Sequence, residues 1–131
     1  MDRARVAAIP VFDGLPEGEL DVIANAASEL EIGAGEAVTS EGEFGHALFA
    51  VETGTAEVSI DGATVGAVGP GDVIGEIAVL ASGRRTASVV ATTPLRVIAL
   101  FKRDVWALDE HAPEAARRLR AALEQHLARA D

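Results

Sequence analysis

The middle of the chain is a series of short apolar runs separated by turn signals. Between Leu30 and Phe101 these runs are rich in Val, Ile, Phe and Thr, and glycines, prolines or an Asp-Gly pair separate them. This spacing is typical of short antiparallel strands in a barrel, sandwich or roll. Asp61-Gly62 predicts a tight hairpin, because a two-residue primed turn needs positive φ at its central positions. The pattern therefore predicts a β-rich region over residues 29–101.

Helical periodicity flanks this region on both sides. Residues 16–27 predict a first helix, because apolar side chains recur there three and four residues apart. The apolar residues just before it, from Ile9 to Leu15, predict a short buried segment. After the strands, residues 102–110 predict a short helix and residues 113–130 a longer one with an apolar stripe. With no internal repeat, the order of helix, strands and helices indicates one domain.

Composition and charge narrow the function. Hydrophobic residues make up 49% of the 131 residues, which favours one folded core over disorder. The absence of cysteine excludes a disulfide scaffold, a thiolate nucleophile and cysteine-ligated zinc. No apolar run approaches the ~18 residues that are needed to span a membrane. Residues 1–9 do not resemble a signal peptide. We therefore expect a cytoplasmic protein. The net charge of −10 disfavours nucleic acid and anionic lipid, so a bound anion must be small and held by a local positive site.

Residues 75–89 break the strand pattern and carry the candidate chemistry. Gly75 precedes a helix-friendly stretch, whose first backbone N–H groups lack internal partners and would attract an anion. Arg85 returns to the region nine residues after Glu76, and its planar guanidinium can bind a phosphate through two parallel hydrogen bonds. An ionised Glu76 only accepts hydrogen bonds, so it fits a ligand that also offers a hydroxyl donor. Phosphate plus ribose hydroxyl describes a nucleotide.

This segment resembles the phosphate-binding cassette of the cyclic-nucleotide-binding domain family, and its residues 75–88 are named the cassette below. The family includes bacterial catabolite activators, protein kinase A regulatory subunits and cyclic-nucleotide-gated channels. The resemblance extends from about Ile9 to Leu127 and includes the sequences at residues 12–15, 41–45 and 69–72. It implies an α+β domain made of an N-terminal helical segment (1–28), an eight-stranded, jelly-roll-like β-roll (29–101) and C-terminal hinge and lid helices (102–131).

The resemblance also implies the roles of individual residues. The cyclic phosphate would be bound by Arg85, by Thr86, by the backbone amides of Ile77 and Ala78, and at Gly75. The ribose 2′-hydroxyl would be bound by Glu76. The base would be lined by Val58 and Val68 and covered by a lid from the last helix, with Leu123, His126 and Ala130. In some relatives the residue at position 86 also contacts a guanine, and His126 stands where a channel relative would carry arginine, so both cAMP and cGMP stay open.

We therefore expect a sensor that binds cAMP reversibly, with cGMP as the second candidate ligand. We expect it to signal by movement of its last helix, to hold no metal or other cofactor, and to catalyse nothing. A protein-interaction module that has lost its nucleotide is the alternative, but Gly75, Glu76, Arg85 and Thr86 are all intact. An enzyme of the cupin-like type would need a histidine and carboxylate metal set, which the sequence does not supply.

The sequence says less about what such a sensor acts on than about its ligand. No helix-turn-helix follows the last predicted helix and no membrane-spanning segment precedes the first. We expect the domain to act on a protein partner, or on a second copy as a homodimer, through the stripe of Leu119, Leu123 and Leu127. The other interpretation is that it is a piece of a larger regulator. We also expect Trp106 to anchor the late helices in the core.

Overall fold

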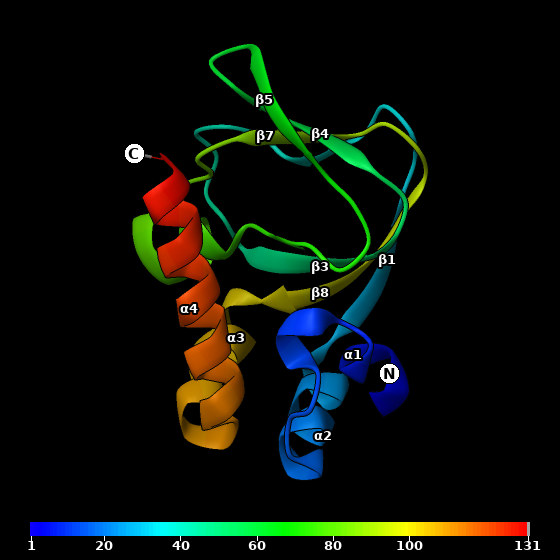
Figure 1. The fold of residues 1–131 in the computed structure, drawn as a ribbon, viewed down its shortest axis with the longest axis vertical. Helices are drawn as coiled ribbons and strands as arrows, with labels where there is room; N and C mark the ends of the chain where they lie inside the picture. The colour runs from blue at the N-terminus through cyan, green and yellow to red at the C-terminus, as the bar shows by residue number, and fades with distance from the viewer. Residues whose placement is uncertain (131) are drawn as a thin grey trace.

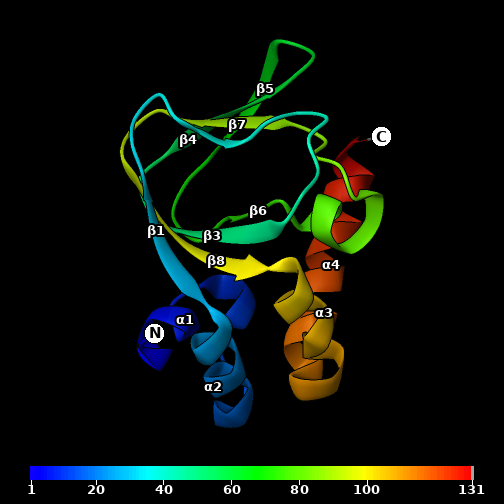
Figure 2. The same ribbon diagram turned by 180° about the vertical axis from the view of Figure 1, so that it is seen from behind.

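The protein folds into two four-stranded antiparallel sheets that face each other, with the N-terminal helices at one end and the C-terminal helix running from that end along the side of the roll (Figures 1 and 2). The computed structural model describes the backbone of residues 1–130 and the side chains of residues 1–81 and 83–125. The first sheet, in the order β1-β8-β3-β6, consists of β1 (Ser28–Ile32), β8 (Leu95–Phe101), β3 (Ala47–Thr53) and β6 (Val73–Ile74). The second, in the order β2-β7-β4-β5, consists of β2 (Ala37–Thr39), β7 (Ser88–Ala91), β4 (Ala56–Ile60) and β5 (Ala63–Val68). The predicted eight-stranded roll is confirmed.

The helices lie where periodicity predicts them, with one addition. They are α2 (Glu17–Ala26), α3 (Lys102–His111) and α4 (Pro113–Ala130), with the short η1 (Pro10–Phe12) before α2. The five-residue α1 (Arg3–Ala7) is not predicted by the pattern; its Asp2 side chain accepts a hydrogen bond from the Ala4 amide at 2.9 Å and so caps it. Within the described residues, no helix is both long and apolar enough to cross a membrane.

The strand β8 separates two hydrophobic cores. Alternate side chains point to opposite faces of a strand, so Leu95, Val97 and Ala99 pack inside the roll. Ile98 and Leu100 point the other way, into the core that the sheet shares with the helices. Burial on both faces explains why this strand is apolar almost throughout instead of alternating with polar residues.

The hairpin between β4 and β5 forms at the predicted turn signal. Between β4 and β5, Asp61 has φ of 52° and Gly62 has φ of 81°, which confirms the predicted hairpin with two positive-φ residues. A side-chain oxygen of Glu41 accepts a hydrogen bond from the Asp61 amide at 3.0 Å. The hairpin tip is thus tied to the loop that follows β2.

The prediction that Trp106 is a core anchor is wrong. Trp106 is 56% exposed, whereas Val105 and Leu108 are the residues that α3 buries. One position along a helix rotates the side chain by about 100°, so Trp106 lies beside the buried face. Its indole N–H donates to the carbonyl of Val79 at 3.1 Å, and the Lys102 ammonium lies 4.9 Å from the ring centroid. Trp106 therefore joins α3 to the cassette from outside the core.

Candidate functional site

The cassette connects β6 to β7 through one wide turn of helix. A first helical turn at Glu76 and Ile77 opens into the π-helix η2 (Ala78–Ser82). Gly83 ends it with φ of 77°, and its amide donates to the carbonyl of Ala78 at 2.9 Å. Gly75, with φ of 91°, makes the turn out of β6. Positive φ at both ends explains why glycine stands at these two positions.

A distant loop holds the far end of the cassette. The Gly42 amide donates to the Arg85 carbonyl at 2.9 Å, and the Arg85 amide donates to the Glu43 carbonyl at 2.7 Å. The Gly45 amide donates to the Gly83 carbonyl at 3.0 Å. The Arg84 side chain donates to the Gly42 carbonyl at 2.9 Å and stacks on the exposed ring of Phe44. Residues 42–45 and 83–85 therefore form one backbone-paired unit.

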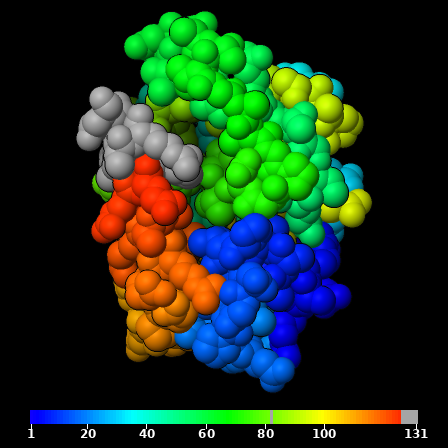
Figure 3. Space-filling view, in the orientation of Figure 1, coloured from blue at the N-terminus to red at the C-terminus, as the bar shows by residue number. Residues whose placement is uncertain are grey.

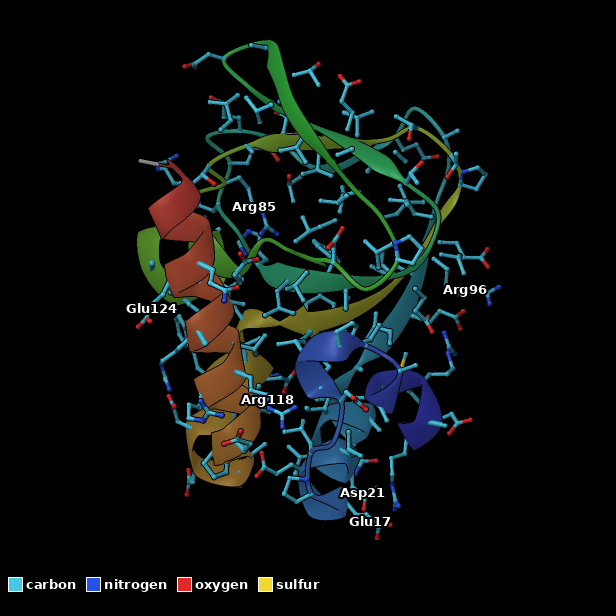
Figure 4. The ribbon with its side chains drawn as sticks, in the orientation of Figure 1. Glu17, Asp21, Arg85, Arg96, Arg118 and Glu124 are labelled. Atoms are coloured by element: carbon cyan, nitrogen blue, oxygen red, sulfur yellow. The ribbon has the colours of Figure 1, made fainter. Side chains whose placement is uncertain are left out.

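The Arg85 side chain turns inward from this unit. It is only 9% exposed, and Figure 4 places it in the space between the two sheets. Its Nη2 donates to the carbonyl of Ala47 at 2.7 Å and its Nη1 to that of Gly75 at 3.2 Å. Burial lowers the pKa of the Arg85 guanidinium, although an arginine in a protein keeps its proton.

No carboxylate among the described residues forms an ion pair with Arg85. Two carbonyl oxygens solvate the buried charge only in part, and a buried charge is costly without a counter-ion. The guanidinium has five N–H donors in total, so donors remain for an anion in the adjoining space.

Beside Arg85 lies a cavity of about 220 Å³ between the cassette and the second sheet. The predicted residues that line it are Val58, Val68, Gly75, Glu76, Ile77, Ala78, Arg85 and Thr86. Sequence reasoning missed the other lining residues, which are Thr39, Val73, Ile74, Ala87 and Val89. One end of the cavity thus carries the charged and polar groups of the cassette, and the other is a wall of valines.

Glu76 contributes a carboxylate to the charged end. The residue is 2% exposed and is one of the largest fully buried side chains. Its backbone follows Gly75 directly, so it enters the cavity from the same turn that supports the Arg85 guanidinium. Thr86 is exposed at the rim of the same end. The arrangement offers a cation, a carboxylate and a hydroxyl to one ligand.

Among the residues whose side chains the structure describes, Leu123 alone is a predicted lid residue, and it does not line the cavity. Leu123 is half-buried on α4. His126 and Ala130 lie outside the residues whose side chains the structure describes. The first half of α4 packs against α3, α2 and η1, beside the blue N-terminal segment in Figure 3. The lid roles of Leu123 and His126 stay predictions.

Known proteins share this architecture. A family model described as "Cyclic nucleotide-binding domain" matches residues 29–111. The Cyclic AMP receptor protein of Thermus thermophilus is 32% identical to this chain over 93% of its residues. The crystal structure of the catabolite activator protein from that organism superposes on this chain with a TM-score of 0.81, and the match covers 60% of that protein. A cGMP-dependent protein kinase of Caenorhabditis briggsae is 38% identical over 72% of the chain, which covers 12% of the kinase.

Two further comparisons concern length and fold. The chain spans 59% of the length of the Thermus receptor and much less of the kinase. A putative cyclic nucleotide-binding protein of Geobacter metallireducens, at 23% identity and a TM-score of 0.84, shares the fold over 100% of this chain and 99% of its own.

Proposed function

The chain belongs to the cyclic nucleotide-binding domain family, and we propose that it is a sensor domain that binds cAMP or cGMP in the cavity beside Arg85. The observation that carries the proposal is the buried guanidinium, which has two carbonyl partners and no carboxylate partner among the described residues. A cyclic phosphate bears one negative charge and two terminal oxygens, so it supplies the counter-ion that Arg85 lacks.

The remaining cavity groups suit the rest of the ligand. We assign the phosphate to Arg85, Thr86 and the amides of Ile77 and Ala78, where Gly75 allows close backbone approach. The buried carboxylate of Glu76 would accept the hydrogen bond of the ribose 2′-hydroxyl. Val58 and Val68 would pack against the faces of the base.

The signal would be a change in the position of α4. Trp106 joins α3 to the cassette through the carbonyl of Val79, so a shift of the cassette reaches α3 and then α4. Leu123 and His126 would then close over the base as a lid. The ligand must bind the closed state more tightly than the open one, because otherwise it shifts no population. The output would pass to a protein partner or to a second copy in the cytoplasm, with no catalysis by this domain.

The test is calorimetric titration of the purified chain with cAMP and cGMP, beside the variants Arg85→Ala and Arg84→Ala. We expect one-to-one binding that Arg85→Ala abolishes and that Arg84→Ala retains, because Arg84 lies at the exposed surface. A hundredfold excess of nucleotide over its Kd should also stabilise the fold by about 2.7 kcal/mol.

Two further results decide between interpretations. Adenosine and guanosine, which lack the phosphate, should fail to bind the wild-type chain, and this comparison does not depend on any variant folding. If neither cyclic nucleotide binds or stabilises the wild-type chain, the sensor proposal is refuted and a protein-interaction module of the same fold becomes the better explanation.

A further inference from the structure

The last helix, α4, has two parts that differ in how they pack. The first part, residues 113–119, contributes three buried side chains to the core that the helices share with the first sheet, namely Ala115, Ala116 and Leu119. In residues 120–125 no side chain belongs to either hydrophobic core, and none is fully buried. These two stretches are named the anchored part (113–119) and the distal part (120–125) below.

Polar contacts with the N-terminal segment also hold the anchored part. A side-chain oxygen of Glu19, on α2, accepts a hydrogen bond from the Ala115 amide at 2.9 Å, and amides in the first turn of a helix have no partner within it. The Arg118 guanidinium donates to the backbone carbonyl of Asp13, which follows η1. A swing of the anchored part would break these bonds and expose its buried side chains, so we expect it to keep its place.

The distal part has much less to hold it. A groove of about 550 Å³ lies between it, η1 and the turn before β6, and Ala121, Ala122 and Gln125 are among the residues of α4 that line the groove. Within the described side chains, the distal part makes one bond with another element, the ion pair of Arg120 with Asp109 on α3. Both of these side chains are about half exposed, and an exposed ion pair contributes little.

The sequence of α4 favours unfolding of the distal part over a swing. Glycine and proline are the usual causes of a sharp kink in a helix, and neither follows Pro113 in α4. The distal part therefore has no hinge on which to turn as a rigid rod. A helix is stabilised mainly by tertiary packing, and fewer residues follow Arg120 in α4 than the about 12–15 that an isolated helix needs. Elements with few buried contacts are the first to open locally.

We propose that the distal part of α4 is a switch between coil and helix, which a nucleotide in the cavity shifts to helix while the anchored part keeps its place. The inference rests on the proposed function and specifies which residues of α4 respond to the ligand. The structure shows the helical form, in which α4 runs along the side of the roll (Figure 1). The predicted lid contact of Leu123 with the base would supply the tertiary packing that the distal part lacks, and a ligand shifts an equilibrium only through such a difference in contacts.

Nuclear magnetic resonance tests the switch residue by residue, because Cα chemical shifts report helix content. They are measured on the complete wild-type chain alone and with saturating cAMP or cGMP. For residues 121–125 we expect values between coil and helix in the free chain, and helix values with nucleotide. Residues 114–119 should have helix values in both states. A rigid swing of the whole helix would instead give helix values throughout in both states.

A matched pair of glycine substitutions tests whether helix formation is coupled to binding. Ala121 on α4 and Ala107 on α3 are both exposed in the interior of a helix. Glycine makes helix formation about fivefold less favourable than alanine does. Ala121→Gly should therefore weaken nucleotide binding about three- to fivefold in calorimetry, because binding must also restore the helix. Ala107→Gly should leave the Kd unchanged, since α3 is helical in both states.

The results separate the switch from the sensor function. Helix values at residues 121–125 in the free chain, an unchanged Kd for Ala121→Gly, or an equal loss of affinity from Ala107→Gly overturns the switch while the sensor function stands. The shift measurement uses the wild-type chain and does not depend on any variant folding. If the wild type binds neither nucleotide, the proposed function fails and this inference with it.

Discussion

An added methyl group at Gly75 would act directly on the Arg85 guanidinium of the candidate site. A Cβ built there would lie 2.2 Å from Nη1 of Arg85, and 3.2 Å from both its Cζ and the carbonyl oxygen of Ala47. The guanidinium ends a flexible side chain, so it can move away. Moving it breaks its hydrogen bonds to the Gly75 and Ala47 carbonyls, however, and leaves a buried charge less well solvated.

Gly83 provides the matched control. It also has positive φ, at 77° against 91° for Gly75, but no atom lies within 4 Å of the place where its Cβ would be. Alanine at either site costs about 1 kcal/mol of backbone strain. Gly75→Ala should cost about 2 kcal/mol more, because a hydrogen bond to a charged group contributes about 1.5–3 kcal/mol. We expect total losses of about 1 kcal/mol for Gly83→Ala and about 3 kcal/mol for Gly75→Ala.

Thermal unfolding followed by circular dichroism measures the difference. In a domain of 131 residues each 1 kcal/mol shifts Tm by about 4 °C, so the two variants should melt about 4 °C and 12 °C below the wild type. In an Arg85→Ala background most of the extra cost of Gly75→Ala should disappear, because only the contact with the Ala47 carbonyl oxygen then remains. Equal losses from Gly75→Ala and Gly83→Ala, or an extra loss that persists in full without Arg85, would refute this account of how the guanidinium is held.

Three further predictions concern the helices. The hydrogen bond from Arg117 holds the pKa of Glu114 at about 2, below its usual 4.5. The stability that the ionised Glu114 contributes is therefore present above pH 4.5 and is lost as the pH falls toward 2. The urea midpoint of Glu114→Gln should change less between pH 5 and pH 3 than that of the wild type. Trp106→Phe should lower the free energy of unfolding by about 1 kcal/mol, since it removes one hydrogen bond to the cassette, and an unchanged urea midpoint would contradict that bond. Leu119→Ala should cost about 3 kcal/mol because Leu119 is 1% exposed, whereas Leu123→Ala, at a half-buried position, should cost clearly less in the same denaturation assay.

The parts of the fold that could be predicted are those encoded locally. The Asp61-Gly62 hairpin and the bounds of α3 and α4 follow from turn chemistry and periodicity, and they agree with the structure to within a residue or two. The helix α1 was missed because five residues make no periodic pattern. Its place depends on contacts with distant residues, such as the ion pair of Arg5 with Glu52 on β3.

The candidate site also has one part that the local sequence predicts and another that depends on distant contacts. The cassette residues are contiguous, so their chemistry can be interpreted directly from the sequence. Thr39, Val73 and Val89 reach the cavity only through the pairing of strands, which no local pattern specifies. Trp106 was misplaced for a related reason: neighbouring apolar residues on α3 leave open which side of the helix faces the core, and Val105 with Leu108 occupies that side.

The strand order of the first sheet has a consequence for how the chain is made. A ribosome releases β1 early, but its partner β8 runs from Leu95 to Phe101 and emerges about 65 residues later. Until then β1 has no neighbour and β3 has only the two-residue β6. The nascent chain must therefore keep an open strand edge and the apolar face of β3 out of contact with other chains until β8 has emerged. Closure of the sheet waits for the last of the eight strands and joins the strands that are most distant in sequence, so it should also be the slow step when this domain refolds.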